Sequence, residues 1–256
     1  MTKTVFITGA SSGIGYACAE KFAEKGYNLV LNARRKDRID ELSERLRSLH
    51  KINVKELIFD VRDKKAVEEG IAHLKSEQIE PDILVNNAGL ALGLSNFYEG
   101  DIQDWEQMVD TNVKGLLYVS KAVAKGMIGR RSGHIINIGS IAGRETYLRG
   151  NVYCATKHAV HSLSEAMRME LVQHGIKVSL VSPGATNTEF SLVRFKGDKE
   201  TADNIYQGYK PLSGDDIAEC IVFCAQLPPH VNINDMLIMP TAQATATIFN
   251  KKPAGS

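Results

Sequence analysis

The sequence predicts an α/β fold in which a doubly wound parallel sheet carries helices on both faces. Two patterns predict it: strand-sized apolar runs recur along the chain, and segments of helical periodicity separate them. A third is the glycine-rich turn TGASSGIG at residues 8–15, between the first run and the first helical pattern. Since single α/β units can reach 256 residues, we expect one domain spanning residues 1–256.

The expected elements follow in chain order. Strands are predicted at residues 5–8, 29–31, 57–59, 83–85, 135–138 and 178–181, and a last short one in DMLIMP at 235–240. Residues 39–49 show apolar side chains at three- and four-residue steps, which indicates an amphipathic helix. Helical patterns also cover 104–127, 152–174 and 215–227. The stretches 104–127 and 152–174 carry enough apolar surface to suggest a subunit interface.

The regular alternation fails after Pro183. Residues 185–212 form an irregular excursion with helical pieces, and long excursions after a sheet strand often cover a ligand. We therefore expect this segment to lie over the substrate.

Composition excludes several classes of function. The net charge is +1 with no basic stripe, so we expect no nucleic-acid partner. The longest apolar runs are strand-sized, so no segment is expected to span a membrane. The N-terminus carries no signal-peptide pattern and the four cysteines form no C-x-x-C pair, which predicts a cytoplasmic protein. His158 and His161 are three residues apart without further ligands nearby, so no metal is expected.

The turn at residues 8–15 is a candidate phosphate site. Glycine permits tight turning and lets a pyrophosphate approach the N–H groups of a helix N-terminus, where the dipole favours an anion. The glycine spacing differs from the usual dinucleotide fingerprint, and a glycine-rich turn alone is a weak signal, so the strand–turn–helix context carries the prediction. The residues expected to bind the cofactor here are Gly9, Ser11, Ser12, Gly13, Ile14 and Gly15.

The end of the second strand indicates which dinucleotide binds. An NAD enzyme places an acid there for the ribose hydroxyls, but here Ala33 takes that place and Arg34 and Arg35 follow. A guanidinium fork matches a 2′-phosphate in charge and geometry, which favours NADP. The alternative is that both arginines are ordinary solvated residues at a helix start.

Three side chains could perform acid–base chemistry. Tyr153 and Lys157 are four residues apart on a predicted helix and share one face. An adjacent ammonium and a cationic nicotinamide both favour the phenolate, which makes Tyr153 a usable acid or base. Ser140, at a strand end, can hydrogen-bond the substrate oxygen. Alone, Tyr-x-x-x-Lys arises by chance in many proteins.

Together these residues resemble the short-chain dehydrogenase/reductases of the compact single-domain type, which have a Rossmann-like fold. Six motifs stand in the family's order across residues 8–188. They are TGASSGIG, NNAG at 86–89, Asn112 in DTNVKG, Ser140, Tyr153 with Lys157, and Pro183 with Gly184.

The resemblance implies roles for further residues. Asn112 is expected to hold a water in a proton relay to Lys157, which also binds the nicotinamide ribose. Read without the resemblance, NNAG could be a plain turn and Asn112 a polar residue bonded to backbone. The other residues implied at the cofactor are Asp60 and Val61 at the adenine, Asn87, Ala88 and Gly89 as support, and Pro183, Gly184, Thr186 and Thr188 over the nicotinamide and phosphates.

Nearly the full length is similar to a narrower group, the NADP-dependent 3-hydroxy acid dehydrogenases that act on serine, allo-threonine and related acids. The similarity rests on NNAGLALG, AGRETY, GNVYCATK, TEFSLVRFKGD and LPPHVNINDMLIMPT. It implies oxidation of a 3-hydroxy acid to a 3-oxo acid or semialdehyde, or the reverse reduction with NADPH. A homotetramer is also implied by the resemblance.

A 3-hydroxy acid presents a carboxylate, which an arginine fork could recognise. Arg194 in the excursion is the favoured candidate and Arg144 the next, ahead of Arg149; each could instead be a surface arginine. Many members of the group have proline where Leu148 stands, which bears on fine substrate preference.

Two other functions stay open from the sequence. One is an NADPH-dependent reductase of neutral ketones or quinones. The other is a non-catalytic NADPH-binding sensor, against which the Ser140, Tyr153 and Lys157 set argues, because a sensor needs no proton relay.

Overall fold

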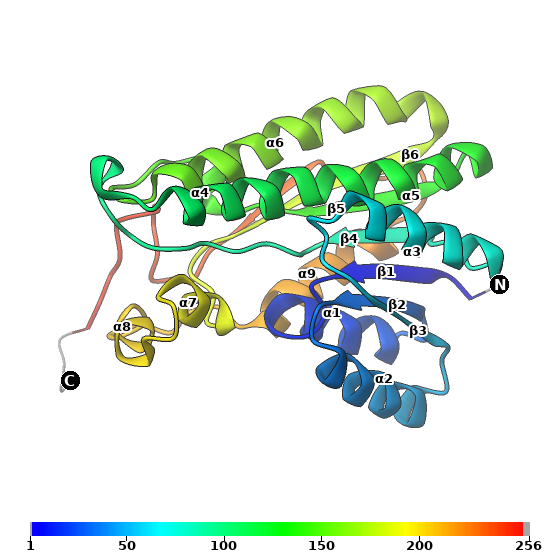
Figure 1. Ribbon diagram of the computed structural model, residues 1–256, viewed down its shortest axis with the longest axis horizontal. Coiled ribbons are helices and arrows are strands. Elements are labelled where there is room, and N and C mark those ends of the chain that lie inside the picture. The colour runs from blue at the N-terminus through cyan, green and yellow to red at the C-terminus, as the bar shows by residue number, and fades with distance from the viewer. Residues whose placement is uncertain (1, 253–256) are drawn as a thin grey trace.

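The computed structural model describes residues 2–252 and contains one seven-stranded parallel sheet in the order β3-β2-β1-β4-β5-β6-β7 (Figure 1). The chain winds outward from β1 in one direction and, after a crossover to β4, in the other. The predicted fold class is confirmed. The strands are β1 (Thr4–Thr8), β2 (Asn28–Ala33), β3 (Val54–Ile58), β4 (Ile83–Asn86), β5 (Gly133–Ile138), β6 (Ile176–Pro183) and β7 (Asp235–Ile238).

The helices cover both faces of this sheet. They are α1 (Gly13–Glu24), α2 (Lys36–His50), α3 (Lys64–Ser76), α4 (Ile102–Val109), α5 (Leu116–Arg130), α6 (Asn151–Leu171), α7 (Glu189–Arg194), α8 (Lys199–Asn204) and α9 (Gly214–Gln226). Shorter turns are η1 (Phe97–Glu99), η2 (Asp110–Gly115), η3 (Ile141–Gly143) and η4 (Val172–His174).

One predicted boundary is corrected. The strand expected at 57–59 is β3 at Val54–Ile58, because this edge strand has polar residues that interrupt the apolar run. The helical stretch expected over 104–127 is confirmed; it contains α4 and α5 joined by the π-helical segment η2, which the spacing of apolar residues does not reveal.

The sheet separates two cores. Val5 and Ile7 of β1 point to the core beneath α1, α2 and α9, while Phe6 points to the core beneath α3, α5 and α6; all three are fully buried. Because both faces are covered, the strand is a continuous apolar run rather than an alternating one. Figure 1 shows the two helical layers; above the sheet, α4 and α5 lie end to end and α6 runs alongside them.

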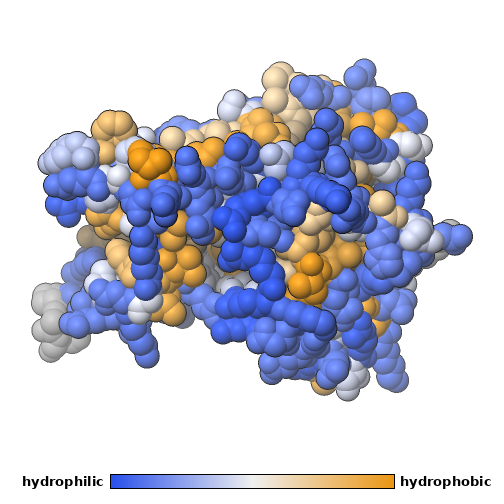
Figure 2. All heavy atoms as spheres, in the orientation of Figure 1, coloured by the Kyte–Doolittle hydropathy of each residue, from blue (hydrophilic) through white to orange (hydrophobic). Residues whose placement is uncertain are grey.

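The expected excursion leaves the sheet after β6 and carries α7 and α8. It returns close to where it leaves, because Leu212 donates its N–H to the Ala185 carbonyl at 3.0 Å and accepts the Asn187 N–H at 2.8 Å. Figure 1 shows α7 and α8 below the end of the α4–α6 layer, and Figure 2 shows hydrophobic residues gathered on this face between the two parts. The excursion is therefore a loop closed at its base.

Across residues 2–252, the helices are all too short or too polar to cross a bilayer. The same part of the chain has no group of three or more His, Cys, Asp or Glu side chains arranged to hold a metal ion.

Candidate functional site

A cavity of about 610 Å³ lies at the carboxyl ends of the parallel strands. Residues that follow four strands line it: Gly9 after β1, Asn87 after β4, Ser140 after β5 and Gly184 after β6. β1 and β4 are neighbours whose connections run in opposite directions, which is the switch point where doubly wound sheets bind ligands. The cavity therefore stands where the fold predicts a dinucleotide.

The glycine-rich turn presents unpaired donors to this cavity. Gly9 and Gly13 have positive φ angles of 67° and 55°, a backbone conformation that favours glycine. Ser12 is the N-cap of α1, but its side chain makes no capping hydrogen bond, so the first N–H groups of the helix stay available to an anion. Gly13 and Ile14 line the cavity. This uncapped helix start fits a pyrophosphate.

Gly15 has a packing role instead of a lining one. A Cβ at Gly15 would lie 2.4 Å from the Gly9 carbonyl oxygen and 2.5 Å from Asn87 Nδ2, so only glycine lets α1 come this close to the turn. Asn87 Nδ2 in turn donates to the carbonyls of Thr8 and Gly9 at 3.0 and 3.1 Å. These contacts fix the turn against the end of β4.

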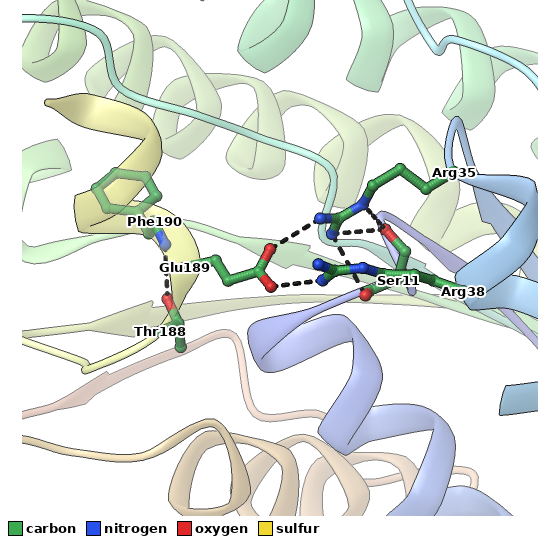
Figure 3. Close-up of polar contacts among 6 residues, drawn as sticks. All are labelled: Ser11, Arg35, Arg38, Thr188, Glu189 and Phe190. Atoms are coloured by element: carbon green, nitrogen blue, oxygen red, sulfur yellow. Dashed lines mark hydrogen bonds and ion pairs between the residues drawn. The ribbon is translucent and has the colours of Figure 1, made fainter. Parts of the chain in front are cut away.

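The arginines predicted to bind the 2′-phosphate form ion pairs within the protein. Arg34 Nη1 lies 3.6 Å from Asp60 Oδ2 and Arg34 is the more exposed partner. Arg35 donates through Nε and Nη2 to Ser11 Oγ at 3.2 and 3.0 Å, and through Nη1 to Glu189 at 2.9 Å (Figure 3). Burial alone would raise the pKa of Asp60, but Arg62 and Arg34 lower it below its ordinary value. Both predicted arginines line the cavity.

Ser140, Tyr153 and Lys157 converge at the other end of the cavity. α6 places Tyr153 and Lys157 on one buried face, with 8% and 7% of each residue exposed. Ser140 and Tyr153 both line the cavity, and the Ser140 Oγ accepts the Ala142 N–H at 3.1 Å. Lys157 Nζ donates to the Ile138 carbonyl at 2.9 Å. The predicted triad is thus assembled from the end of β5 and the start of α6.

The protonation of this triad differs from the expectation in one respect. Burial raises the pKa of Tyr153 above its ordinary value, and the hydrogen bond from Ser140 and the charge of Arg194 oppose that rise only in part. Burial also lowers the pKa of Lys157 to about 8. In the protein alone the ammonium therefore does not make the phenol a ready base, because Lys157 is directed to a backbone carbonyl.

Asn112 lies behind the cavity, in the π-helical segment η2. Its Oδ1 accepts the Leu90 N–H at 2.8 Å, and its Nδ2 donates to the Leu90 carbonyl at 2.8 Å and to Thr156 Oγ1 at 3.0 Å. Thr156 is bonded to the Tyr153 carbonyl at 2.8 Å. The side chain therefore joins η2, the NNAG turn and α6, and its amide hydrogens are already used.

Arg194 lies beside Tyr153. Its guanidinium carbon is 5.6 Å from the ring centres of both Tyr147 and Tyr153, Nη1 donates to the Tyr147 hydroxyl at 3.0 Å, and Nε donates to the Gly93 carbonyl at 3.2 Å. Among residues 2–252, Nη2 makes no hydrogen bond. Phe190 packs on the Tyr153 ring at 5.6 Å between centres. A guanidinium fixed by two hydrogen bonds therefore lies next to Tyr153.

Arg144 requires a correction. Its guanidinium is paired with the Asp235 carboxylate at the start of β7, and it does not line the cavity. The charge that was predicted to bind a substrate carboxylate is instead paired with a carboxylate of the edge strand β7. Most predicted residues do line the cavity; among the cofactor and catalytic candidates, only Gly15 and Asn112 do not.

Several lining residues were not predicted. The C-terminal segment contributes Gln243, Ala246 and Phe249, and the excursion contributes Glu189 and Tyr206. None of them follows a sheet strand directly. Glu189 belongs to the TEFSLVRFKGD segment, but no pattern in that segment indicates that its side chain reaches the cavity.

Comparisons with known proteins agree with this geometry. A family model described as short chain dehydrogenase matches residues 3–198. The NADP-dependent 3-hydroxy acid dehydrogenase YdfG of Salmonella typhi is 44% identical over 94% of this chain and 96% of its own. Sulfoacetaldehyde reductase 2 of Chromohalobacter salexigens is 42% identical over 95% of this chain and 96% of its own.

A solved structure is equally similar. The closed form of serine dehydrogenase complexed with NADP⁺ has a TM-score of 0.90 and 41% sequence identity, and the match covers 98% of this chain and all of the other. The likeness therefore extends over the sheet, both helical layers and the excursion.

Proposed function

Because the chain belongs to the short-chain dehydrogenase family, we propose that it is an oxidoreductase that transfers a hydride between NADP(H) and a small 3-hydroxy acid. The products of oxidation are a 3-oxo acid or semialdehyde, and serine, allo-threonine and 3-hydroxypropionate are the substrates of the expected type. The names of the relatives from Salmonella typhi and Chromohalobacter salexigens support this class of reaction.

One observation carries the proposal. A single cavity has an uncapped helix start at one end and the Ser140, Tyr153 and Lys157 triad at the other, so phosphate binding and proton transfer share one space. Arg194 then adds a cation next to the triad. Hydride transfer from a hydroxy acid requires three parts in this order: a site for the cofactor phosphates, residues that move a proton, and a cation that pairs with the substrate carboxylate.

The mechanism follows from these residues. Bound NADP supplies the hydride acceptor in oxidation and, when reduced, the hydride donor. In oxidation Tyr153 removes the hydroxyl proton as phenolate, while Ser140 donates a hydrogen bond to the substrate oxygen and holds it against the phenol. Lys157, at hydrogen-bonding range of the Ile138 carbonyl, holds a positive charge beneath the site. In reduction Tyr153 returns the proton as a general acid.

Asn112 acts in this scheme as a positioning residue. Its side chain fixes Thr156, and Thr156 bonds the Tyr153 carbonyl, so the chain of contacts holds the start of α6. A relay water would be bound through the backbone of η2, since the Asn112 amide is already engaged.

Arg194 is the residue we propose to bind the substrate carboxylate. The side chain is held by Tyr147 and Gly93, its Nη2 makes no hydrogen bond with the described residues, and Arg194 lines the cavity. A preorganised guanidinium loses little entropy when it pairs with an acid. A carboxylate or a sulfonate in the same position relative to the carbonyl satisfies this geometry, and the sulfoacetaldehyde reductase relative acts on the second kind.

Replacing Arg194 with Gln is expected to lower kcat/KM for 3-hydroxypropionate about 10- to 100-fold, mainly through KM, because a charge-assisted hydrogen bond to the acid is lost. Reduction of a neutral ketone should change much less. Steady-state kinetics on both substrates measure the difference. Arg144→Gln is the matched control, since that arginine lies outside the cavity. Equal losses on acid and ketone would contradict the assignment.

We propose NADP rather than NAD because Arg34 and Arg35 stand where an acid would otherwise bind the ribose. Arg34→Gln is expected to weaken NADPH binding about tenfold and leave NADH binding nearly unchanged, since only NADPH carries the 2′-phosphate. Nucleotide fluorescence titrations measure both. Lys36→Gln, which removes an exposed charge from the start of the same helix, controls for general electrostatics. A similar weakening for both nucleotides would count against phosphate recognition.

Two other functions remain distinguishable. A reductase of neutral ketones or quinones would leave Arg194 without a role, and such an enzyme would reduce these compounds better than acids. A sensor would bind NADPH tightly without turning over a carbonyl. Leu148 lines the cavity and is 88% exposed. The mouth of the site is therefore open to larger substrates.

We also propose that the protein is a homotetramer in the cytoplasm. The α4–α5 and α6 layer, where the sequence suggested a subunit interface, retains exposed apolar side chains, among them Val109, Ile128 and Met169. The excursion over residues 185–212 is proposed to cover the substrate, because α7 brings both Phe190 and Arg194 to the triad.

A further inference from the structure

Glu189 bridges two arginines at the edge of the cofactor cavity (Figure 3). Its Oε2 accepts from Arg35 Nη1 at 2.9 Å, and its Oε1 accepts from Arg38 Nη1 at 2.5 Å. Glu189 begins α7, whereas both arginines belong to the start of α2 on the other side of the cavity. The carboxylate therefore joins the excursion to the cofactor-binding half of the sheet.

The bridge occupies the nitrogens that a phosphate would need. Arg35 uses Nε and Nη2 on Ser11 and Nη1 on Glu189, so each of its three nitrogens has a partner. Arg38 was not among the expected cofactor residues, yet it shares the same carboxylate. The two arginines form one cationic pair, and the Glu189 carboxylate offsets one of its two positive charges.

The position of Glu189 is set by its surroundings. Thr188, the N-cap of α7, accepts the Phe190 N–H at 3.2 Å, and Phe190 points to the opposite side of the helix (Figure 3). Burial alone would raise the pKa of Glu189, but Arg38 and Arg35 lower it below its ordinary value, so the carboxylate is charged at neutral pH. Glu189, Ser11 and Gly13 line both the main cavity and a second one of about 350 Å³ between α1 and α2. The bridge thus stands at the border of the two.

We propose that Glu189 is an internal competitor of the 2′-phosphate of NADP for Arg35 and Arg38, and so sets how strongly the protein prefers NADP over NAD. The inference rests on the proposed function. A phosphate monoester carries more negative charge than a carboxylate and has three acceptor oxygens, so it can replace Glu189 on the guanidinium pair. NAD has no 2′-phosphate and leaves the bridge intact. Glu189 therefore lowers the affinity for NADP alone.

The test uses the full-length protein and the isosteric substitution Glu189→Gln. Dissociation constants for NADPH and NADH come from nucleotide fluorescence at one fixed ionic strength, and those for 2′-AMP and 5′-AMP from displacement of NADPH. We expect NADPH and 2′-AMP to bind roughly three- to tenfold more tightly to the variant, the effect of losing two half-exposed ion pairs, with NADH and 5′-AMP unchanged. Glu200→Gln is the matched control: it removes an exposed acid of α8 that forms no ion pair among the described residues.

Each other outcome contradicts the inference. Unchanged or weaker NADPH binding by the variant would show that Glu189 does not compete with the 2′-phosphate. Weaker binding of all four ligands would show that the Glu189 bridge helps to hold the bound nucleotide. Equal tightening for all four, or the same effect in Glu200→Gln, would reduce it to general electrostatics. If the unmodified protein itself fails to prefer NADPH, the proposed cofactor is wrong and the inference falls with it.

Discussion

The Tyr153→Phe variant is expected to lose about 10²- to 10⁴-fold in kcat for both oxidation and reduction, the usual contribution of a general acid or base. Phenylalanine keeps the ring that packs on Phe190 and removes only the phenolic hydroxyl. NADPH binding and the thermal unfolding midpoint should stay close to those of the unmodified protein. Stopped assays at high enzyme concentration measure the residual rate.

The pH dependence of the unmodified enzyme has a definite sign. Oxidation needs the deprotonated phenol, and burial raises the pKa of Tyr153, so the oxidation rate should increase from neutral to alkaline pH while the protein stays folded. Tyr153→Phe should lack this rise. A flat profile in the unmodified enzyme at saturating cofactor would contradict the role of Tyr153, as would a Phe variant with normal kcat.

Lys157→Met is expected to abolish most activity and at the same time to stabilise the cofactor-free protein. Burial lowers the pKa of Lys157 to about 8 from its ordinary 10.5, so the ammonium is unfavourable in the folded state. This pKa difference corresponds to a loss of at most about 3 kcal/mol in the free energy of unfolding at neutral pH. Methionine fills a similar volume without charge. Urea unfolding at neutral pH measures the free energy of unfolding of both proteins.

The size of this stabilisation depends on pH. Between pH 8 and 10.5 the unfolded chain holds a proton on Lys157 that the folded protein has released, so the stability of the unmodified protein rises with pH in that window. The advantage of Lys157→Met should therefore be greatest below pH 8 and shrink toward pH 10.5. A variant that is less stable than the unmodified protein at neutral pH would show that the site is organised around the charge.

The parts of the fold and of the site that could be predicted depend on patterns within short segments of the chain. The strands after which Gly9, Asn87 and Ser140 stand are short apolar runs, and the glycine-rich turn and the Tyr153–Lys157 spacing lie within single segments. Each of these patterns constrains only a few consecutive residues. The order of the strands then places their carboxyl ends together, which brings the motifs into one cavity.

The features that could not be predicted depend on distant pairings. Glu189 meets Arg35 and Arg38 from more than 150 residues away, and Arg194 meets Gly93 from 101 residues away. Arg144 ranked second to Arg194 as the predicted carboxylate partner, yet it pairs with Asp235 of the edge strand. The sequence does not show which group an arginine will contact. The cavity lining and the ion pairs of the structure distinguish Arg194 from Arg144.

Absorbance at the NADPH band, recorded with purified protein and NADP, tests the central claim most directly. L-serine, L-allo-threonine and 3-hydroxypropionate are compared in parallel, with NAD in place of NADP and Tyr153→Phe as controls. We expect that NADP is reduced with at least one acid, that NAD is a poor substitute, and that the Phe variant is inactive. Reduction of neutral ketones or quinones by NADPH, with no turnover of any acid in either direction, would contradict the proposed substrate class.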